Sequence, residues 1–210
     1  MMRILPKWIR RVLGVSEAQK NVHPKMDTFL KECDRVNAEN ARALHIEPAL
    51  AQAFMEEVLV CEASKVETLI STEPALVNFK DALGETPLHR AAVGGDENSN
   101  MIARLLIDKG ADVTAKDHQA CTPLHLAAAC RYVETAKMLI DHGADIRART
   151  DNGSEPIHFV TDREMVELLL SHGADINARS NFGETPLAVM LRTHAPDWLV
   201  SFTRKKGGEL

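Results

Sequence analysis

The sequence predicts an all-α fold with short β-hairpin turns, arranged as a solenoid of about five repeats with a helical cap at its N-terminal end. Three observations support this prediction. Residues 117–149 contain two short helix patterns followed by a turn, and the neighbouring segments repeat that pattern. Four repeats begin with Thr-Pro-Leu-His or a variant of it, and three close with Gly-Ala-Asp. Two short helices and a turn cannot bury their apolar faces alone, so each unit needs copies of itself on either side.

The central repeat shows how the sequence specifies each element. Thr122 is a favourable N-cap, and Pro123 suits the first position of a helix, where its missing N–H is not needed. The apolar spacing between Val133 and Ile140 predicts a second helix. Gly143 ends that helix, because glycine adopts a positive φ at low cost. The turn-forming residues that follow predict a hairpin.

The other repeats are placed by the same two motifs. The starting motif occurs, with variations, at residues 86–89, 122–125, 155–158 and 185–188, and the closing motif at 110–112, 143–145 and 173–175. This pattern resembles the ankyrin repeat family, which shares the Thr-Pro-Leu-His signature and the 33-residue period. The resemblance covers residues 81–179 most closely. It implies stacked helix pairs, and it implies that His89, His125 and His158 form hydrogen bonds tying each helix start to a hairpin.

The chain is therefore divided into three parts. Residues 1–25 form a basic amphipathic segment and linker, residues 26–47 a capping helix, and residues 48–210 the repeat domain. The repeats span about 48–80, 81–116, 117–149, 150–179 and 180–210. Outer repeats that depart from the pattern are expected, because the ends of a solenoid meet water.

Two repeats differ in length from the central one. Repeat 81–116 is three residues longer, and the extra residues are expected to form a loop bulge within 94–100. Repeat 150–179 is three residues shorter and is expected to lack a helical turn near 160–162. Glu155 there replaces the capping threonine, a loss of about 1 kcal/mol for the cap. The shortening is either neutral or opens a notch for a partner.

The N-terminal segment carries an unusual concentration of positive charge. Residues 1–16 have a charge of +4 in a chain of net charge −5, which leaves −9 for the rest. An apolar stripe at helical spacing accompanies the charges and consists of Leu5, Trp8, Ile9, Val12 and Leu13. Three interpretations remain open: a helix or tail covering the first repeat, a helix on a membrane surface, and a mitochondrial transit peptide.

Composition limits the remaining possibilities. The four cysteines show no CxxC spacing and no signal peptide precedes them, which indicates a reduced, cytoplasmic protein. No nucleotide-binding, zinc-protease or hydrolase motif occurs, so neither an enzyme nor a cofactor is expected. His118, Cys121 and His125 have side chains that zinc accepts. However, His125 belongs to the repeat motif and no fourth ligand is suitably spaced, so no metal site is expected.

The resemblance implies that a protein partner binds the concave surface formed by the hairpin tips and the first helix of each repeat. The residues expected to contact it are Lys80, Leu83, Arg90, Lys116, His118, Gln119, Arg131, Tyr132, Arg149, Asp151, Asn152, Arg179 and Phe182. Leu83 and Phe182 occupy equivalent tip positions and either form hot spots or pack on adjacent tips. The basic residues of the tips are interrupted by aspartates, which favours an acidic or mixed protein segment over nucleic acid.

The predicted function is a monomeric, non-enzymatic adaptor or scaffold. Two alternatives remain. One is a scaffold tethered to a membrane or directed to an organelle by residues 1–16. The other is an inhibitory subunit that masks an enzyme or a transcription factor.

Overall fold

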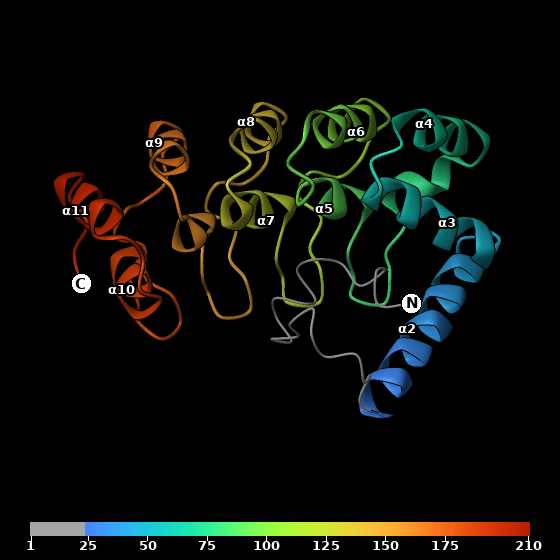
Figure 1. The fold of residues 1–210 in the computed structure, drawn as a ribbon, viewed down its shortest axis with the longest axis horizontal. Helices are drawn as coiled ribbons and strands as arrows, with labels where there is room; N and C mark the ends of the chain where they lie inside the picture. Colours follow the sequence, from blue (N-terminus) through green and yellow to red (C-terminus); the bar gives the residue numbers. More distant parts are fainter. Residues whose placement is uncertain (1–23) are drawn as a thin grey trace.

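The computed structural model describes residues 24–210, with side chains from residue 31 onward, and shows an elongated stack of helices (Figure 1). The predicted amphipathic helix of residues 1–16, including Leu5, Trp8, Ile9, Val12 and Leu13, lies outside the described residues and stays a prediction. The α-helices are α2 (Pro24–Ala43), α3 (Pro48–Leu59), α4 (Ala63–Thr72), α5 (Pro87–Ala91), α6 (Glu97–Asp108), α7 (Pro123–Cys130), α8 (Val133–Asp141), α9 (Arg163–Ser171), α10 (Pro186–Arg192) and α11 (Asp197–Lys205), and the 3-10 helices are η1 (Pro74–Asn78) and η2 (Pro156–Phe159).

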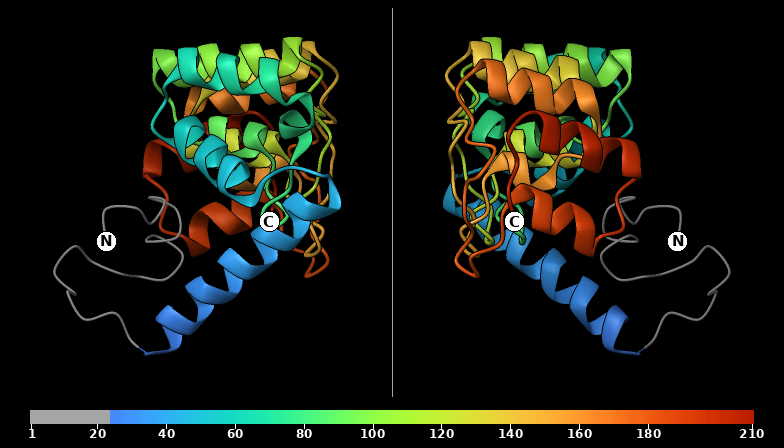
Figure 2. Two further views of the ribbon diagram at one scale, coloured as in Figure 1. Left: turned by 90° about the vertical axis from the view of Figure 1, so that its right-hand side faces the viewer. Right: turned by 90° about the vertical axis from the view of Figure 1, so that its left-hand side faces the viewer.

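The helices form two layers. Helices α4, α6, α8 and α9 make an outer layer, while α3, α5, α7, η2 and α10 make an inner layer beneath it (Figure 1). Figure 2, which looks along the stack, shows the hairpin tips projecting from one side of the two layers. The first and second helices of the repeats therefore lie in separate layers, as expected for a helical solenoid. Among residues 24–210, no helix is long and apolar enough to cross a membrane.

The core between the layers is aliphatic. Each inner helix places the leucine or isoleucine of its starting motif in the centre, and the four equivalent residues Leu88, Leu124, Ile157 and Leu187 are all buried. Small residues such as Ala127 and Ala128 are fully buried and let neighbouring helices approach closely. The repeating motif thus supplies one large side chain per unit at the same depth, so the core continues from repeat to repeat.

The hairpins are tight turns rather than strand ladders. Within residues 24–210, no β-strand is present. In the first tip the Asp81 N–H donates to the Glu85 carbonyl at 3.0 Å, and the Gly84 N–H donates to the Asp81 carbonyl at 2.9 Å. The other three tips close through the equivalent pair of bonds. The predicted hairpin turns are therefore present, but each is too short to form a strand pair.

The connection between the two helices of repeat 81–116 is longer than in the next repeat, at residues 92–96 compared with 131–132, so part of the predicted loop bulge is present. The bulge ends earlier than predicted, because α6 begins at Glu97 and residues 97–100 are helical. Asp96 caps this additional turn, because its Oδ1 accepts from the Ser99 N–H at 2.7 Å and from the Ser99 hydroxyl at 2.6 Å. Gly94 and Gly95 thus lie in the predicted loop, and the Asp96 cap limits that loop to the residues before Glu97.

The shortened repeat, in contrast, behaves as predicted. Its first helix is the single 3-10 turn η2, and Val160 already has an extended backbone. Glu155 keeps one cap contact, since its N–H donates to His158 Nδ1 at 3.1 Å. Its carboxylate is poorly compensated, because Oε2 is buried without a hydrogen bond and Oε1 lies 3.9 Å from the Arg149 guanidinium. This unit therefore has the weakest helix start of the central stack.

Helix α2 contacts the first hairpin tip. The Ala82 N–H donates to Asn37 Oδ1 at 2.6 Å, and the Asn40 amide donates to the Lys80 carbonyl at 3.0 Å. The helix ends at Ala43, before the predicted boundary at residue 47, and α3 starts at Pro48. These bonds place the C-terminal half of α2 beside the first tip.

Helix α11 divides its two aromatic residues between the core and the surface. Phe202 is buried on the fourth repeat, where the Arg163 guanidinium carbon lies 4.4 Å from the centre of its ring. Trp198, by contrast, is 53% exposed at the start of α11. Of these two residues, only Phe202 is therefore buried against the fourth repeat.

One tip position offers a direct test of backbone strain. Ala120 has a φ of 56° at the position where the other three tips have glycine. This conformation costs an alanine about 1–2 kcal/mol, whereas glycine adopts it freely at a cost in unfolded-state entropy of about 0.5–1 kcal/mol. Ala120→Gly should therefore raise the free energy of unfolding in urea by up to about 1 kcal/mol.

Gly84→Ala is the matched control. Gly84 has a φ of +76°, and a methyl group at this position would lie 2.6 Å from the His118 ring. This variant should be clearly destabilised. If Ala120→Gly were equally destabilised, the strain at the third tip would be disproved.

Candidate protein-interaction surface

Each motif histidine joins its own helix start to the next hairpin. His125 Nδ1 accepts from the Thr122 N–H at 3.1 Å, and its Nε2 donates to the Ser154 carbonyl at 3.2 Å. The equivalent bonds run from His89 to the Cys121 carbonyl (3.1 Å) and from His158 to the Glu184 carbonyl (3.2 Å). The bridging role implied by the sequence resemblance is confirmed. We call this series of contacts the histidine ladder.

The histidine ladder requires neutral imidazole rings. One nitrogen must accept a hydrogen bond while the other donates one, and only a neutral imidazole can do both. Burial lowers the pKa of His89 and His158 and lowers that of His125 to about 4. At neutral pH all three rings are therefore in the form that the contacts need.

A second ladder consists of cations on the tips. Lys80 donates to the Lys116 carbonyl at 2.9 Å, and Lys116 donates to the Arg149 carbonyl at 3.4 Å. Arg149 then donates to the Arg179 carbonyl at 3.0 Å, and Arg179 to the backbone oxygen of Leu210 at 3.3 Å. These four predicted site residues are exposed, and each also links two repeats. Their charges consequently form an ordered row along the tips.

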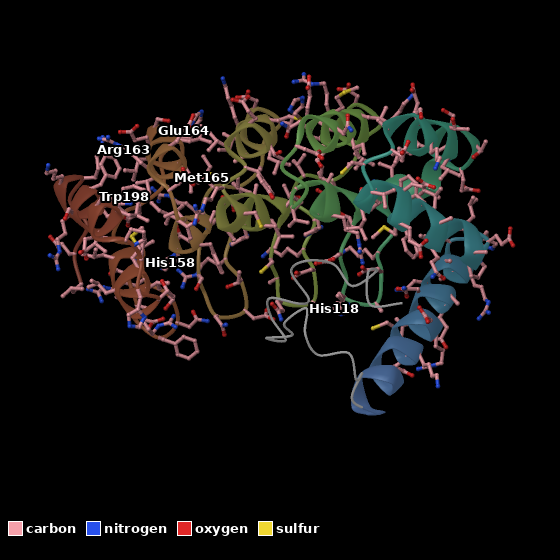
Figure 3. All side chains as sticks on the ribbon, in the orientation of Figure 1. His118, His158, Arg163, Glu164, Met165 and Trp198 are labelled. Atoms are coloured by element: carbon pink, nitrogen blue, oxygen red, sulfur yellow. The ribbon has the colours of Figure 1, made fainter. Side chains whose placement is uncertain are left out.

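The tips themselves form a third series of contacts, the tip ladder. Each tip donates one backbone N–H to a carbonyl of the preceding tip. The three bonds are His118 N–H to Leu83 (3.0 Å), Asp151 N–H to Gln119 (3.0 Å) and Asn181 N–H to Asn152 (2.9 Å). Six predicted site residues thus lie together on the tips: Leu83, His118, Gln119, Asp151, Asn152 and Phe182. Figure 3 shows His118 at the tips and His158 within the stack.

The structure separates this row from two other predicted residues. Arg131 and Tyr132 follow the C-terminus of α7, whereas the tips precede its N-terminus. Since α7 has eight residues, about 12 Å of helix lies between them. Arg131 is exposed and donates to the Thr161 hydroxyl at 2.8 Å. Tyr132 packs over Gly95, where a methyl group would lie 1.7 Å from its ring. The predicted site therefore forms two rows at opposite ends of the inner helices. One is the row of tips, and the other, the loop row, contains Arg131 and Tyr132.

The space between the rows contains residues that the sequence analysis missed. Arg90 begins a line of equivalent positions on the inner helices, continued by Leu126, Phe159 and Val189, all half-buried. Phe159 packs edge-on against His125, with ring centres 5.6 Å apart. Phe159 has the same position in its repeat as Arg90 has in the second repeat. The shortened helix of repeat 150–179 hid this correspondence in the sequence. An apolar strip of Leu126, Phe159 and Val189 therefore runs along the stack between the row of tips and the row of loops.

Arg90 is less available than predicted. Its side chain is only 12% exposed and forms an ion pair with Asp81. Glu85 lies on the other side, with Oε2 3.8 Å from the Arg90 Nε, and neither of these two atoms has a hydrogen bond. Burial raises the pKa of Glu85 to about 8, since Arg90, already held by Asp81, compensates only in part. The guanidinium of Arg90 is thus used mainly in contacts within the repeat, and little of it is left for a partner.

A shallow groove lies beside the loop row. It has a volume of about 260 Å³ and is lined by Gly95, Asn100, Arg131, Tyr132, Val133, Glu134 and Glu164. The lining is polar and carries two carboxylates. In the part of the chain from residue 24 onward, no group of three His, Cys, Asp or Glu side chains is placed to hold a metal ion. What these residues offer chemically is an extended contact surface.

The stacked units and their periodic hydrogen bonds define a repeat protein that presents a rigid surface. The pattern of ankyrin repeats in three copies matches residues 55–150, and a single ankyrin repeat matches residues 152–181. The chain belongs to the ankyrin repeat family, and ankyrin repeats mediate protein–protein interaction. Over 66 residues it is 33% identical to the transient receptor potential cation channel subfamily A member 1 of Drosophila melanogaster. This match covers 31% of the chain and only 5% of the channel.

The histidine ladder predicts that the free energy of unfolding decreases as the pH is lowered below 6.5. The three folded-state pKa values lie below the unfolded value near 6.5, so unfolding takes up protons once the pH falls below 6.5. Their contribution is complete above pH 6.5 and is lost as the pH falls toward the folded values. His125 alone should contribute a loss of roughly 2 kcal/mol at pH 5. Urea unfolding between pH 7 and pH 5 measures this slope.

His125→Ala is the control for that slope. The variant should be less stable at pH 7 because the Ser154 carbonyl loses its donor, yet its stability should change less with pH. An unchanged slope in the variant would show that His125 does not take up a proton on unfolding.

Glu85 should act in the opposite direction. Its folded-state pKa of about 8 exceeds the unfolded value, so its contribution is present below about pH 4.5 and is lost as the pH rises toward 8. Glu85→Gln keeps the shape and removes the ionisation, so it should stabilise the protein at pH 9 by about 1–3 kcal/mol and by less at pH 5. Urea unfolding at both pH values provides the comparison. A destabilised variant at pH 9 would mean that ionised Glu85 is a favourable partner of Arg90.

Proposed function

We propose that this chain is a non-enzymatic adaptor that binds a partner protein with the surface between the tips and the loop row. The apolar strip of Leu126, Phe159 and Val189 would supply contact area at the centre, and the polar residues of the two rows would fix the orientation of the partner. This arrangement matches the usual anatomy of a protein interface, with an apolar centre and a polar rim. Binding would proceed without covalent chemistry.

The observation that carries this proposal is the order of the exposed side chains. Lys80, Lys116, Arg149 and Arg179 each reach a carbonyl of the next repeat, so their positions are set by the stack. A partner that meets such a surface finds side chains whose rotamers are already restricted. Less conformational entropy is then lost on binding, which favours affinity at modest contact area.

The charge of the rows indicates an acidic or mixed partner segment. Four cations follow the tips at equivalent positions, and Arg131 adds a fifth on the loop row. Asp151, Glu134 and Glu164 interrupt these charges, so the positive row is not continuous. A nucleic acid would need a continuous positive stripe. A protein segment with acidic residues spaced along it fits this pattern better.

The proposal can be tested by quantitative capture of partners from the cells that make the protein. Lys116→Glu combined with Arg131→Glu reverses one charge on each row and should reduce recovery of the principal partner at least tenfold. The matched control is Arg104→Glu combined with Lys137→Glu, which makes the same change of charge on the outer helices α6 and α8. Both variants should unfold at nearly the wild-type temperature, since all four side chains are exposed.

The control should retain wild-type recovery. Equal losses in the two double variants would show that net charge, not this surface, governs capture. Wild-type recovery by the row variant would refute the proposed surface.

A further inference from the structure

The last hairpin tip, residues 181–183, differs from the other tips because nothing in the described chain follows it along the tip ladder. Where a glycine tip is followed by another tip, the junction has two contacts. The next tip donates an N–H to a carbonyl, as His118 does to Leu83 at 3.0 Å. The next tip also lays a side chain over the preceding glycine, as His118 does over Gly84.

The junction before the last tip has the same two contacts. The Asn181 N–H donates to the Asn152 carbonyl at 2.9 Å. The Asn181 side chain covers Gly153 so closely that a methyl group there would lie 2.2 Å from Asn181 Oδ1. The pattern thus holds wherever a glycine tip is followed by another tip.

The last tip presents both features to solvent. Phe182 occupies the position of Leu83 and Asn152, and its carbonyl accepts no hydrogen bond from residues 24–210. Gly183 occupies the position of Gly84 and Gly153, yet no described atom lies within 4 Å of a methyl group placed on it. The Phe182 side chain beside them is 73% exposed. An acceptor, an open glycine and an exposed aromatic ring therefore lie together.

The other ladders do not end in this way. The C-terminal residues 207–210 close each of them. Arg179 ends the cation ladder by donating to the backbone oxygen of Leu210 at 3.3 Å. In the last repeat Ala188 stands in place of the motif histidine. There the Thr185 hydroxyl donates instead, to the Glu209 carbonyl at 2.6 Å. Only the tip ladder, among the described contacts, stops with an unused acceptor.

The opposite end of the tip ladder is closed. In the first tip the Ala82 N–H corresponds to the N–H groups of His118, Asp151 and Asn181, which bond to a preceding tip. Asn37 of α2 supplies the acceptor instead, at 2.6 Å. A second copy of the chain therefore cannot offer its first tip to Phe182 while α2 is docked. The first tip of a second copy is therefore excluded, and we consider a different polypeptide as the occupant of the last tip.

The charges around the last tip indicate the nature of that polypeptide. Arg179 donates to the Gly183 carbonyl at 2.9 Å, and Arg149 lies 3.3 Å from Asn181 Oδ1. Among the described residues, no side-chain carboxylate forms an ion pair with Arg179. A carboxylate on a docked segment could pair with it, whereas a basic segment would meet two guanidinium groups.

From these contacts we propose that the last tip docks an extended, acidic segment of a partner protein, which continues the tip ladder. The segment donates a backbone N–H to the Phe182 carbonyl, lays a side chain over Gly183 and packs an apolar residue on Phe182. Strand-like addition of this kind takes affinity from the main chain and specificity from the side chains. The inference rests on the proposed function and names the part of the surface where the partner begins to bind.

A library of random 12-residue peptides displayed on phage, selected on the full chain, provides the probe. The most enriched peptide is then synthesised, and its affinity is measured by fluorescence anisotropy. We expect an apolar residue flanked by acidic residues. Phe182→Ala should raise Kd at least tenfold, and methylation of one peptide nitrogen, which removes the donor to the Phe182 carbonyl, should do the same.

Leu83→Ala is the matched control, because Leu83 has the equivalent position in a tip whose carbonyl is already bonded. It should change Kd less than twofold. Equal effects of the two variants, or no enriched peptide, would overturn the docking site. A peptide that depends on Lys116 and Arg131 but not on Phe182 would overturn it while supporting the proposed function.

Sedimentation of the full chain completes the test. The wild type should remain monomeric. A dimer that dissociates in Phe182→Ala would identify a second copy as the occupant and would contradict the proposal.

Discussion

The hydrogen bond from each motif histidine to the next hairpin is the interaction on which the rest of the structure depends. It links the start of an inner helix to a tip that belongs to the following repeat, as between His125 and the Ser154 carbonyl. The spacing between helix layer and tips is thereby the same in every inner unit. The cation and tip ladders can follow only because this spacing is kept, and with them the order of the exposed side chains. The contact itself works because burial keeps the imidazole neutral.

A solenoid built in this way is a chain of nearest-neighbour contacts, so its properties are decided at its irregular units and its ends. The fourth repeat has a one-turn inner helix and a poorly compensated Glu155, which makes it the weakest of the central junctions. The two ends are treated differently. Helix α2 closes the tip ladder through Asn37, whereas the last tip leaves its carbonyl and its glycine exposed. The two ends of the tip ladder therefore differ: α2 closes one end, and the other leaves hydrogen-bonding groups open to solvent.

Much of the fold could be predicted from the sequence because the repeat motif encodes it locally. Pro87, Pro123 and Pro186 begin inner helices as expected, and the missing turn of the fourth repeat was found from its length. Features without a periodic signal could not be predicted. The Asn37 contact joins residues 45 apart and follows no repeat phase. The ion pair of Arg90 with Asp81 could not be predicted either, because the sequence does not show which carboxylate a single arginine contacts. For the candidate site, the tip residues were identified by phase, but their separation from Arg131 and Tyr132 became clear only in three dimensions.

The histidine ladder requires neutral imidazoles that bridge each helix start to the next hairpin, and NMR of the histidine side chains observes them directly. In protein labelled with ¹⁵N and ¹³C, spectra at pH 7 should show His89, His125 and His158 in the neutral form with the proton on Nε2. Each should also show a coupling across the hydrogen bond to the carbonyl carbon of Cys121, Ser154 or Glu184. Protonated rings, or protons on Nδ1, would contradict the histidine ladder and with it the fixed surface that the proposed interactions require.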